Sequence, residues 1–333
     1  MSDRTGAFRQ LEGFGLAPEI SIVLPAHNEA GNISAIAAAI AQAMALAGAY
    51  EIVFVDDGSR DGTLAAIRDA ARDPAIRYLS FTRNFGHQAA LRAGLRHARG
   101  RAVIVMDADF EHPPELIPQL IAAWRGGARI VATQRSDDAG VSSAKRLTSR
   151  LYYRVLDAIG DVRIEPGSAD FMLLDRAVVD VINGLEDQDL FLRGLVRWLG
   201  FPLTTIPYAR GTRQHGESSF SASRMVELAL SGIAAHSVRP LRFAIWLALG
   251  FAALGFLFVI YAVVSFLFVQ HTVAGWSSIV AVIAILGAAQ LLVLGIIGEY
   301  VGRILRETRR RPSYIVAETE ATRGAAKPIE PAA

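Results

Sequence analysis

Long apolar segments near the C-terminal end dominate the pattern of this chain. Residues 243–298 contain no Asp, Glu, Lys or Arg, and their main polar interruption is Gln270–Ser278. Because a helix needs about 20 apolar residues to cross a bilayer, the pattern predicts two membrane-spanning helices, Leu241–Val269 and Ser278–Tyr300. The alternative is a helical hairpin buried in a large soluble core, which charge-free runs of this length disfavour.

The charges beside these segments predict their orientation. Arg239 and Arg242 precede the first segment, an arginine cluster follows the second, and the loop between them has no Lys or Arg. Since positively charged flanks stay in the cytoplasm, both outer ends of the hairpin are expected there. Met1–Leu16 has no apolar core of the signal-peptide type. We therefore expect a multi-pass protein of the cytoplasmic (inner) membrane, with its N-terminal domain and both termini in the cytoplasm.

The region before these segments alternates short apolar runs with longer amphipathic segments. The apolar runs predict strands at Ile20–Leu24, Ile52–Val55, Ile76–Phe81, Ala102–Met106 and Ile130–Thr133. The amphipathic segments predict helices at Asn32–Ala47, Asp61–Ala71, Gln88–Ala98 and Pro113–Trp124. This alternation indicates an α/β fold with a mostly parallel sheet and helices on both faces. In such sheets, ligands bind beyond the carboxyl ends of the strands.

Charge and composition narrow the expected partners and the expected compartment. A net charge of +2 gives no bulk basic field, so no nucleic-acid partner is expected. The chain has no cysteine, which excludes disulfides and fits a reducing compartment. Residues 317–333, rich in Ala, Pro, Glu and Thr, are typical of a disordered tail. The predicted parts are an N-terminal extension (1–18), a cytoplasmic domain (19–222), an interfacial amphipathic helix (223–240), a transmembrane hairpin (241–302) and a basic, then disordered, cytoplasmic tail (303–333).

Polar clusters follow three of the predicted strands. They are His27–Glu29, Asp56–Ser59 and Asp107–Asp109. Each cluster alone could cap a helix, and capping explains Ser59 and Asp61 as well as ligand contact does. Three clusters at one sheet edge favour a binding site. Asp107 and Asp109 offer hard oxygen ligands to Mg²⁺ or Mn²⁺, and such a cation neutralises charge on a leaving diphosphate.

At these clusters the chain resembles a known family. Residues 22–29 (I-V-L-P-A-H-N-E), 55–63 (V-D-D-G-S-R-D-G-T) and 107–115 (D-A-D-F-E-H-P-P-E) are similar to motifs of the inverting family 2 glycosyltransferases. The similarity extends over 19–315, including 191–195 (F-L-R-G-L) and both apolar segments. The subgroup it resembles is the polyprenyl-phosphate glycosyltransferases, which include dolichol-phosphate mannose synthases. The resemblance implies a GT-A fold.

The resemblance also implies roles for single residues. The residues implied in nucleotide-sugar binding are Pro25, His27, Glu29, Asp56, Asp57, Ala108, Arg135 and Arg213. Among them, Asp56 is an alternative to Asp57 in the nucleoside pocket, and His27 stands where the family more often has Tyr. Asp107 and Asp109 would be catalytic metal ligands. Glu111 replaces the usual Gln, either as a third ligand or facing solvent. Asp170 matches an aspartate near the sugar, with an orienting role.

A basic and aromatic segment, Val141–Ile159, is predicted to receive the acceptor. Cations mixed with aromatic residues on a helix suit a membrane surface, although an ordinary surface helix is the alternative. Arg150 could hold a lipid phosphate through a bidentate contact, with Lys145 nearby. A lipid monophosphate is already anionic, so its attack needs positioning rather than a general base. We interpret His87, His97 and His112 as ordinary polar residues.

Three functions fit the sequence. The favoured one is transfer of a sugar from a UDP- or GDP-sugar to a polyprenyl phosphate at the membrane. A processive polysaccharide synthase would need more spans and a Q-x-x-R-W motif, whereas Leu195 and Val196 precede Arg197-Trp198 here. A non-catalytic membrane scaffold is disfavoured by the intact Asp107 and Asp109. The sequence leaves open the sugar, the base of the nucleotide and the oligomeric state, with a homo-oligomer compatible.

Overall fold

The structure, a computed structural model, describes residues 18–135, 167–185, 191–208, 239–268, 275–309 and 311–322. The chain divides into two compact units. One unit comprises Met1–Arg146, Ile164–Ser219 and Pro312–Ala333, and the other comprises Leu147–Arg163 and Phe220–Arg311. The first unit therefore holds chain from both sides of the apolar segments.

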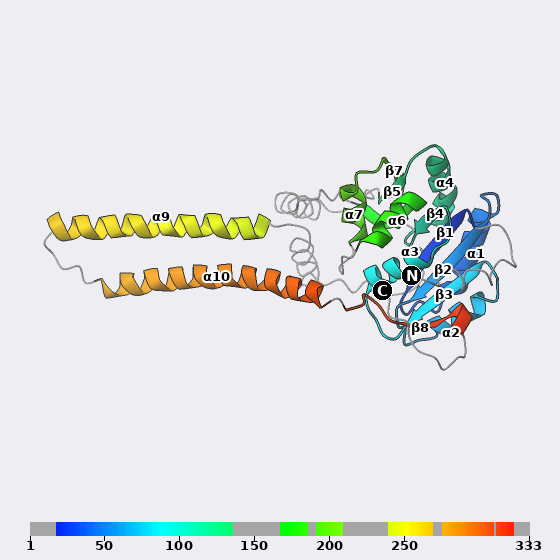
Figure 1. Ribbon diagram of the computed structural model, residues 1–333, viewed down its shortest axis with the longest axis horizontal. Coiled ribbons are helices and arrows are strands. Elements are labelled where there is room, and N and C mark those ends of the chain that lie inside the picture. Colours follow the sequence, from blue (N-terminus) through cyan, green and yellow to red (C-terminus); the bar gives the residue numbers. More distant parts are fainter. Residues whose placement is uncertain are drawn as a thin grey trace, which may run out of the picture. The chain divides into compact units, whose positions relative to one another are not determined.

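The first unit is built on an eight-stranded sheet, counted over the described residues, with the order β7-β5-β6-β4-β1-β2-β3-β8 (Figure 1). The strands are β1 Ile20–Ala26, β2 Tyr50–Asp56, β3 Ile76–Phe81, β4 Ala102–Val105, β5 Ile130–Arg135, β6 Ser168–Asp175, β7 Leu203–Tyr208 and β8 Val316–Thr319. β6 and β8 are antiparallel to their neighbours, and the other pairs are parallel. The predicted mostly parallel α/β sheet is confirmed.

Helices cover both faces of this sheet. They are α1 Ile33–Met44, α2 Thr63–Ala70, α3 His87–His97, α4 Ile117–Arg125, α6 Arg176–Gly184 and α7 Leu192–Trp198, with short 3-10 turns η2 Pro114–Leu116 and η3 Glu320–Thr322. Alternate residues of a strand point to opposite faces. In β1, Ile22 and Leu24 join the core under α1, α2 and α4, whereas Val23 joins the core under α3, α6 and α7. Strands buried on both faces explain the uninterrupted apolar runs in the sequence.

The segment after the apolar helices returns to the sheet, so the predicted disordered tail is wrong for residues 317–322. β8 pairs with β3, and Tyr314 just before it is 2% exposed and stacked on Phe81 with ring centroids 5.0 Å apart. Glu318 pairs with Arg68 and accepts the Tyr78 hydroxyl at 2.5 Å. A composition rich in Ala and Glu concealed this strand, because the charge of Glu318 is paired with partners of other elements, Arg68 and Tyr78.

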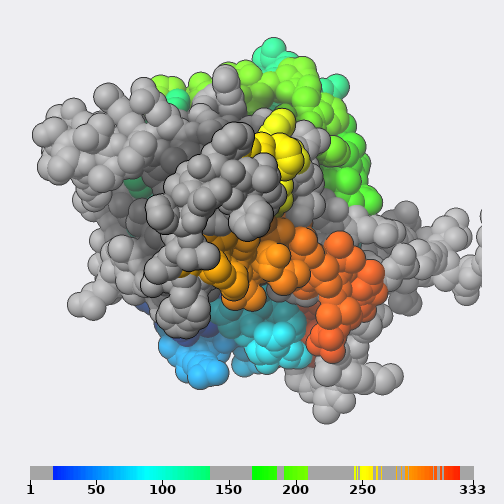
Figure 2. All heavy atoms as spheres, turned by 90° about the vertical axis from the view of Figure 1, so that its left-hand side faces the viewer, coloured from blue at the N-terminus to red at the C-terminus, as the bar shows by residue number. Residues whose placement is uncertain are grey.

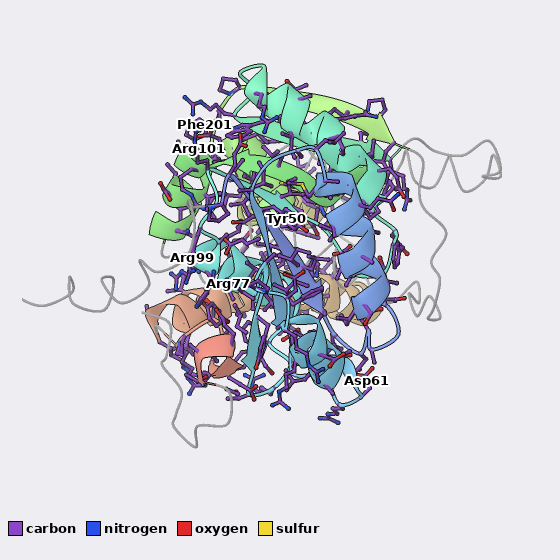
Figure 3. The ribbon with its side chains drawn as sticks, turned by 90° about the vertical axis from the view of Figure 1, so that its right-hand side faces the viewer. Tyr50, Asp61, Arg77, Arg99, Arg101 and Phe201 are labelled. Atoms are coloured by element: carbon purple, nitrogen blue, oxygen red, sulfur yellow. The ribbon has the colours of Figure 1, made fainter. Side chains whose placement is uncertain are left out.

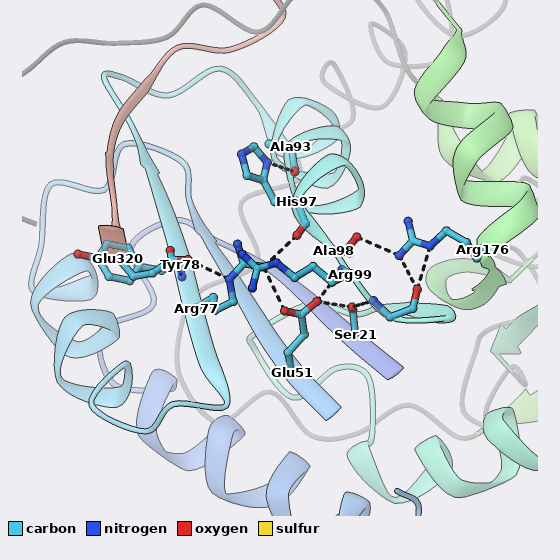
Figure 4. Close-up of polar contacts among 11 residues, drawn as sticks. Ser21, Glu51, Arg77, Tyr78, Ala93, His97, Ala98, Arg99, Arg176 and Glu320 are labelled. Atoms are coloured by element: carbon cyan, nitrogen blue, oxygen red, sulfur yellow. Dashed lines mark hydrogen bonds and ion pairs between the residues drawn. The ribbon is translucent and has the colours of Figure 1, made fainter. Parts of the chain in front are cut away.

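Paired charged side chains lie at the amino ends of the central strands. Glu51 is 5% exposed and accepts bonds from the Ser21 hydroxyl at 2.6 Å, the Arg99 N–H at 2.6 Å and Arg77 Nη1 at 3.1 Å (Figure 4). Arg77 also bonds Glu320 at 2.9 Å, and Arg77 and Arg99 lie side by side (Figure 3). Because these groups satisfy one another, the amino edge is a structural network.

The second unit contains two long helices, α9 Arg239–Phe268 and α10 Trp276–Thr308. Within the described residues, one stretch, Ile285–Gly302 of α10, is long and apolar enough to cross a membrane, with a mean hydropathy of 1.7. Ala248–Leu257 of α9 is a shorter apolar stretch. Large side chains of α10 such as Leu291 are exposed, Leu291 to 71%. The atoms of α10 are orange in Figure 2. The helical hairpin forms as expected, and the double crossing stays a prediction.

Candidate active site

The carboxyl ends of neighbouring strands bring most of the predicted site residues to one edge of the sheet. β1 pairs in parallel with β2 and β4, so the residues that follow these three strands emerge next to one another. β6 runs antiparallel to β4, which places Asp170, near its start, at the same edge. Arg135 ends β5 there as well, because the preceding Gln134 pairs with Ser168 at the start of β6.

Two buried aspartates at the end of β2 hold the surrounding backbone. Asp56 is 1% exposed and accepts one backbone N–H and one serine hydroxyl. Asp57 accepts the N–H groups of Phe85 and Gly86 at 2.7 and 3.0 Å. Burial raises the pKa of Asp57, and these N–H groups and His27 offset the rise only in part. Asp57 therefore fixes the loop that leads into α3, while a nucleoside contact for either aspartate stays a prediction.

The residues predicted from β1 form a second part of this edge. Pro25 is buried in the strand, and His27 is exposed just beyond it. The His27 Nδ1–H donates to the carbonyl of Asp57 at 2.9 Å, which ties the ends of β1 and β2 together. The Glu29 carboxylate accepts the side-chain amide of Asn32 at 2.6 Å. Of these three residues, His27 is the exposed one, and a ligand contact for it stays a prediction.

The predicted metal ligands lie on a tight turn after β4. The Asp107 side chain is 34% exposed, and Ala108 behind it is 2% exposed and belongs to the core. Asp109 Oδ1 accepts the Glu111 N–H at 3.0 Å. That bond engages the backbone of Glu111 and leaves open whether its carboxylate is a third ligand.

A buried histidine holds the backbone of this turn through a hydrogen bond. His112 is 5% exposed, and its Nδ1 accepts the Asp107 N–H at 2.9 Å, so its proton is on Nε2. Its ring stacks on Phe171, with centroids 5.2 Å apart. Phe110, which follows Asp109, has a φ of +65°, which is unfavourable for a bulky side chain. Such strained backbone conformations occur often at active sites.

Asp170 lies at the centre of a charged cluster that joins three elements. Its carboxylate is 2% exposed and receives Arg193 Nε and Nη2 of α7, each at 2.8 Å. His87 Nε2, from the first residue of α3, lies 3.4 Å from Asp170 Oδ2 and 3.7 Å from Asp107 Oδ1. One imidazole nitrogen therefore lies near both carboxylates and closer to Asp170.

Opposing forces set the protonation of this cluster. Burial disfavours the charged carboxylate of Asp170, yet hydrogen bonds from His87 and Arg193 hold its pKa well below the usual range. Burial likewise lowers the pKa of His87, but the bond to Asp170 and the charges of Asp107 and Asp170 outweigh it, so the His87 pKa is raised. A carboxylate with a depressed pKa and both oxygens occupied is a poor general base, which agrees with an orienting role.

Three contributors to this site, His87, His112 and Arg193, carried no predicted role. Their partners are distant in sequence, so only the fold brings them together. Arg193 had the strongest sequence signal, because it lies in the F-L-R-G-L stretch at 191–195. His97 fits the interpretation as an ordinary polar residue, since its Nδ1–H donates to the Ala93 carbonyl at 2.8 Å in its own helix.

The donor chemistry of the turn suits a hard divalent cation. Asp107 and Asp109 supply carboxylate oxygens at a partly exposed edge. No group of three or more His, Asp or Glu arranged to hold a metal occurs among the described residues. Mg²⁺ in phosphate-transferring sites commonly takes only one or two carboxylates and completes its shell with substrate phosphates and water. The two aspartates fit that pattern.

Three basic residues that were predicted to contact phosphates lie outside the described residues. They are Arg213, Arg150 and Lys145. Arg135 is described and exposed, and its backbone N–H donates to the Gly167 carbonyl at 2.8 Å. Gly167 has a φ of +80°, and a Cβ there would lie 2.6 Å from the Arg135 carbonyl oxygen. This position thus requires glycine, and the close approach fixes the end of β5.

Comparisons with known proteins match this chain to glycosyltransferases. Residues 21–182 match the profile of glycosyl transferase family 2. The chain is 38% identical over 271 residues to the uncharacterized glycosyltransferase YkcC of Bacillus subtilis, covering 81% of this chain and 84% of that protein. It is also 38% identical over 300 residues to the bactoprenol glucosyl transferase of Shigella phage SfV, covering 90% and 98% of the two chains.

Similarity to solved structures is weaker. Glucosyl-3-phosphoglycerate synthase from Mycobacterium tuberculosis, solved with Mn²⁺ and UDP-glucose, superposes with a TM-score of 0.45 at 19% identity. The match covers 66% of this chain and 77% of that one.

Proposed function

The chain belongs to glycosyl transferase family 2, and on that premise we propose that it transfers a sugar from a nucleotide-sugar donor to a polyprenyl phosphate. The observation that carries the proposal is the similarity to a bactoprenol glucosyl transferase over 98% of that protein's length. Such coverage includes the apolar helices as well as the sheet. The carboxylate-rich sheet edge supplies the chemistry that the reaction requires.

We place the donor across the ends of β1, β2 and β4. His27, Glu29 and Asp57 with Pro25 would contact the nucleoside, and Asp56 supports them from the interior. Asp107 and Asp109, with Ala108 between them, would hold Mg²⁺ or Mn²⁺, which neutralises charge on the departing diphosphate. Arg135 and Arg213 would face the phosphates. Glu111 is left either as a further ligand or as a solvent-facing residue.

The reaction follows from the charge of the acceptor. A phosphate oxygen of the lipid attacks the anomeric carbon and forms the new C–O bond. The bond from that carbon to the donor diphosphate breaks, and its electron pair leaves on the diphosphate. No proton has to be removed from the attacking oxygen, so the reaction needs no general base. The pairing of Asp170 with Arg193 therefore does not hinder it. Asp170 would orient the groups around the sugar.

The acceptor is expected to arrive from the membrane. The hairpin of α9 and α10 would anchor the enzyme in the cytoplasmic membrane as two spans, with both termini in the cytoplasm. Arg150 and Lys145 of the basic and aromatic segment would hold the lipid phosphate at the surface. Arg is suited to this task, because its planar fork matches a phosphate better than an ammonium does.

A donor screen tests this proposal. The full-length protein in native-lipid membranes would be incubated with labelled UDP- and GDP-sugars, and the label in lipid, polymer and water-soluble fractions would be compared. We expect label in a lipid that releases free sugar on mild acid treatment, as a sugar phosphodiester does. Label in polymer would indicate a processive synthase instead, and no transfer from any donor would indicate a scaffold.

A further inference from the structure

His87 occupies a position that the reaction outlined above does not use. Its Nε2 lies between carboxylate oxygens of two different strands, 3.4 Å from Asp170 and 3.7 Å from Asp107. The imidazole is 41% exposed, whereas the Asp170 side chain is 2% exposed. His87 therefore reaches from a fully buried group to the partly open edge of the sheet.

The buried side of this contact is rigid. Arg193 Nε and Nη2 each lie 2.8 Å from one oxygen of Asp170, which is the planar two-bond arrangement that orients a carboxylate. Asp170 is also fixed by its position in the sheet, because β6 pairs with both β4 and β5. The Asp170 carboxylate beside His87 is therefore held in a fixed position.

The backbone that carries His87 is held as well. The two preceding residues, Phe85 and Gly86, donate their N–H groups to Asp57. Gly86 has a φ of +101°, a conformation that L side chains rarely adopt, just before α3 begins. The imidazole consequently enters the site from a loop clamped to the end of β2.

We propose that His87 is a positioning residue that holds the Asp107 carboxylate in the orientation from which it binds the donor's cation. His112 fixes the backbone of Asp107 through its N–H, so the side chain is the part still to be fixed. His112 Nδ1 also lies 3.6 Å from Asp107 Oδ2, but it already accepts the Asp107 N–H and has no proton to donate to the carboxylate. His87 Nε2, 3.7 Å from Asp107 Oδ1 and anchored on Asp170, can donate one. The inference rests on the proposed function, because it assigns Asp107 to a cation. Groups that hold metal-binding carboxylates typically contribute 10- to 100-fold in affinity or activity.

The test compares His87→Ala and His87→Gln with the control His97→Gln in the full-length protein in lipid nanodiscs. His97 is the last residue of the same helix, so the control asks what a histidine substitution in α3 does away from the site. Mn²⁺ binding is measured by electron paramagnetic resonance, with UDP and GDP added separately, and kcat and KM are measured with the best donor. Thermal unfolding checks that each variant is folded.

We expect His87→Ala to weaken Mn²⁺ binding and to lower kcat, each by about 10- to 100-fold, with little change in the KM for the acceptor. His87→Gln keeps an N–H donor at similar reach and should recover much of both losses. His97→Gln should match the wild type in both measurements.

Each failure has a distinct meaning. If the wild type binds Mn²⁺ and transfers sugar, and folded His87→Ala does so equally well, the positioning role is wrong and the proposed function stands. Lost activity with unchanged Mn²⁺ binding in His87→Ala would also overturn the proposal, because His87 would then act other than through Asp107. A wild type that transfers sugar without binding Mn²⁺ or Mg²⁺ would remove the metal from the proposed function and this inference with it.

Discussion

At the residue scale, Asp107 and Asp109 have the most direct consequence for activity. Their partly exposed carboxylates lie on a turn whose backbone is held by His112 through the Asp107 N–H, so either side chain can be shortened without opening the core. Asp109→Ala should lower transfer by about 100- to 1,000-fold while the protein stays folded.

A chelator should inhibit the wild type, and added Mg²⁺ or Mn²⁺ should restore it. Glu111→Gln is the matched control and should stay active; full activity in excess chelator would exclude the metal role.

Arg193 and Asp170 make a second prediction at this scale, on stability. Arg193→Ala leaves the buried Asp170 carboxylate without its two shortest bonds, and because Arg193 is itself 40% exposed we expect a cost of about 1–3 kcal/mol. Denaturant unfolding of the full-length protein should show this loss. Arg193→Lys should recover part of it, because an ammonium keeps the charge but not the fork. Equal stability of Arg193→Ala and the wild type would contradict the paired arrangement.

The sequence identified some of these residues and not others for a physical reason. Asp107, Asp109 and Asp57 follow apolar runs directly, so the rule that ligands bind at strand ends locates them. Asp170 was assigned through the family resemblance. His87 begins a helix, where a polar residue is common, and its place in the site depends on its distances to Asp107 and Asp170, which only the fold brings near.

At the element scale, β8 gives a prediction on pH. The Tyr78 hydroxyl donates to Glu318 of β8, and burial, with Glu318 nearby, raises the pKa of Tyr78 from 10.0 to about 12. Because the folded-state pKa exceeds the unfolded one, this stabilisation is complete below about pH 10 and is lost as the pH rises towards 12. Hydrogen exchange of residues 316–319 should therefore accelerate steeply over that range.

Tyr78→Phe is the control for this prediction. It removes the ionising group, so exchange in β8 should be somewhat faster at pH 8 but should rise less between pH 10 and pH 12 than in the wild type. An identical alkaline rise in both proteins would show that Tyr78 does not control the attachment of β8.

The sequence predicts the central elements better than the outer ones. The strand Ile76–Phe81 is observed with the expected bounds, and β1, β2 and β4 differ from prediction only at their ends. These strands are buried on both faces, which gives a strong apolar signal. β7 carries partly exposed residues, and β8 carries Glu318, whose charge is paired with Arg68 of α2, so neither shows a strand pattern.

At the scale of the whole molecule, the two-span arrangement predicts which positions of the chain face the outside of the cell. A cysteine at Thr272 in the cysteine-free chain should react with an impermeant reagent applied to intact cells, because the loop between the helices is expected on the outer side. Cysteines at Ser2 and Ala332 should react only after the cells are opened. Labelling of either terminal position in intact cells would contradict the two-span arrangement.

The central claim is that the acceptor is a lipid phosphate, and varying the acceptor tests it most directly. Purified full-length protein would receive its best labelled nucleotide sugar with undecaprenyl phosphate, undecaprenol or no added lipid, and the product would be identified by mass spectrometry. We predict transfer to undecaprenyl phosphate alone, as a product with one phosphate between sugar and lipid, and loss of that product in Asp109→Ala. Equal transfer to undecaprenol, or transfer that needs no lipid, would contradict the account.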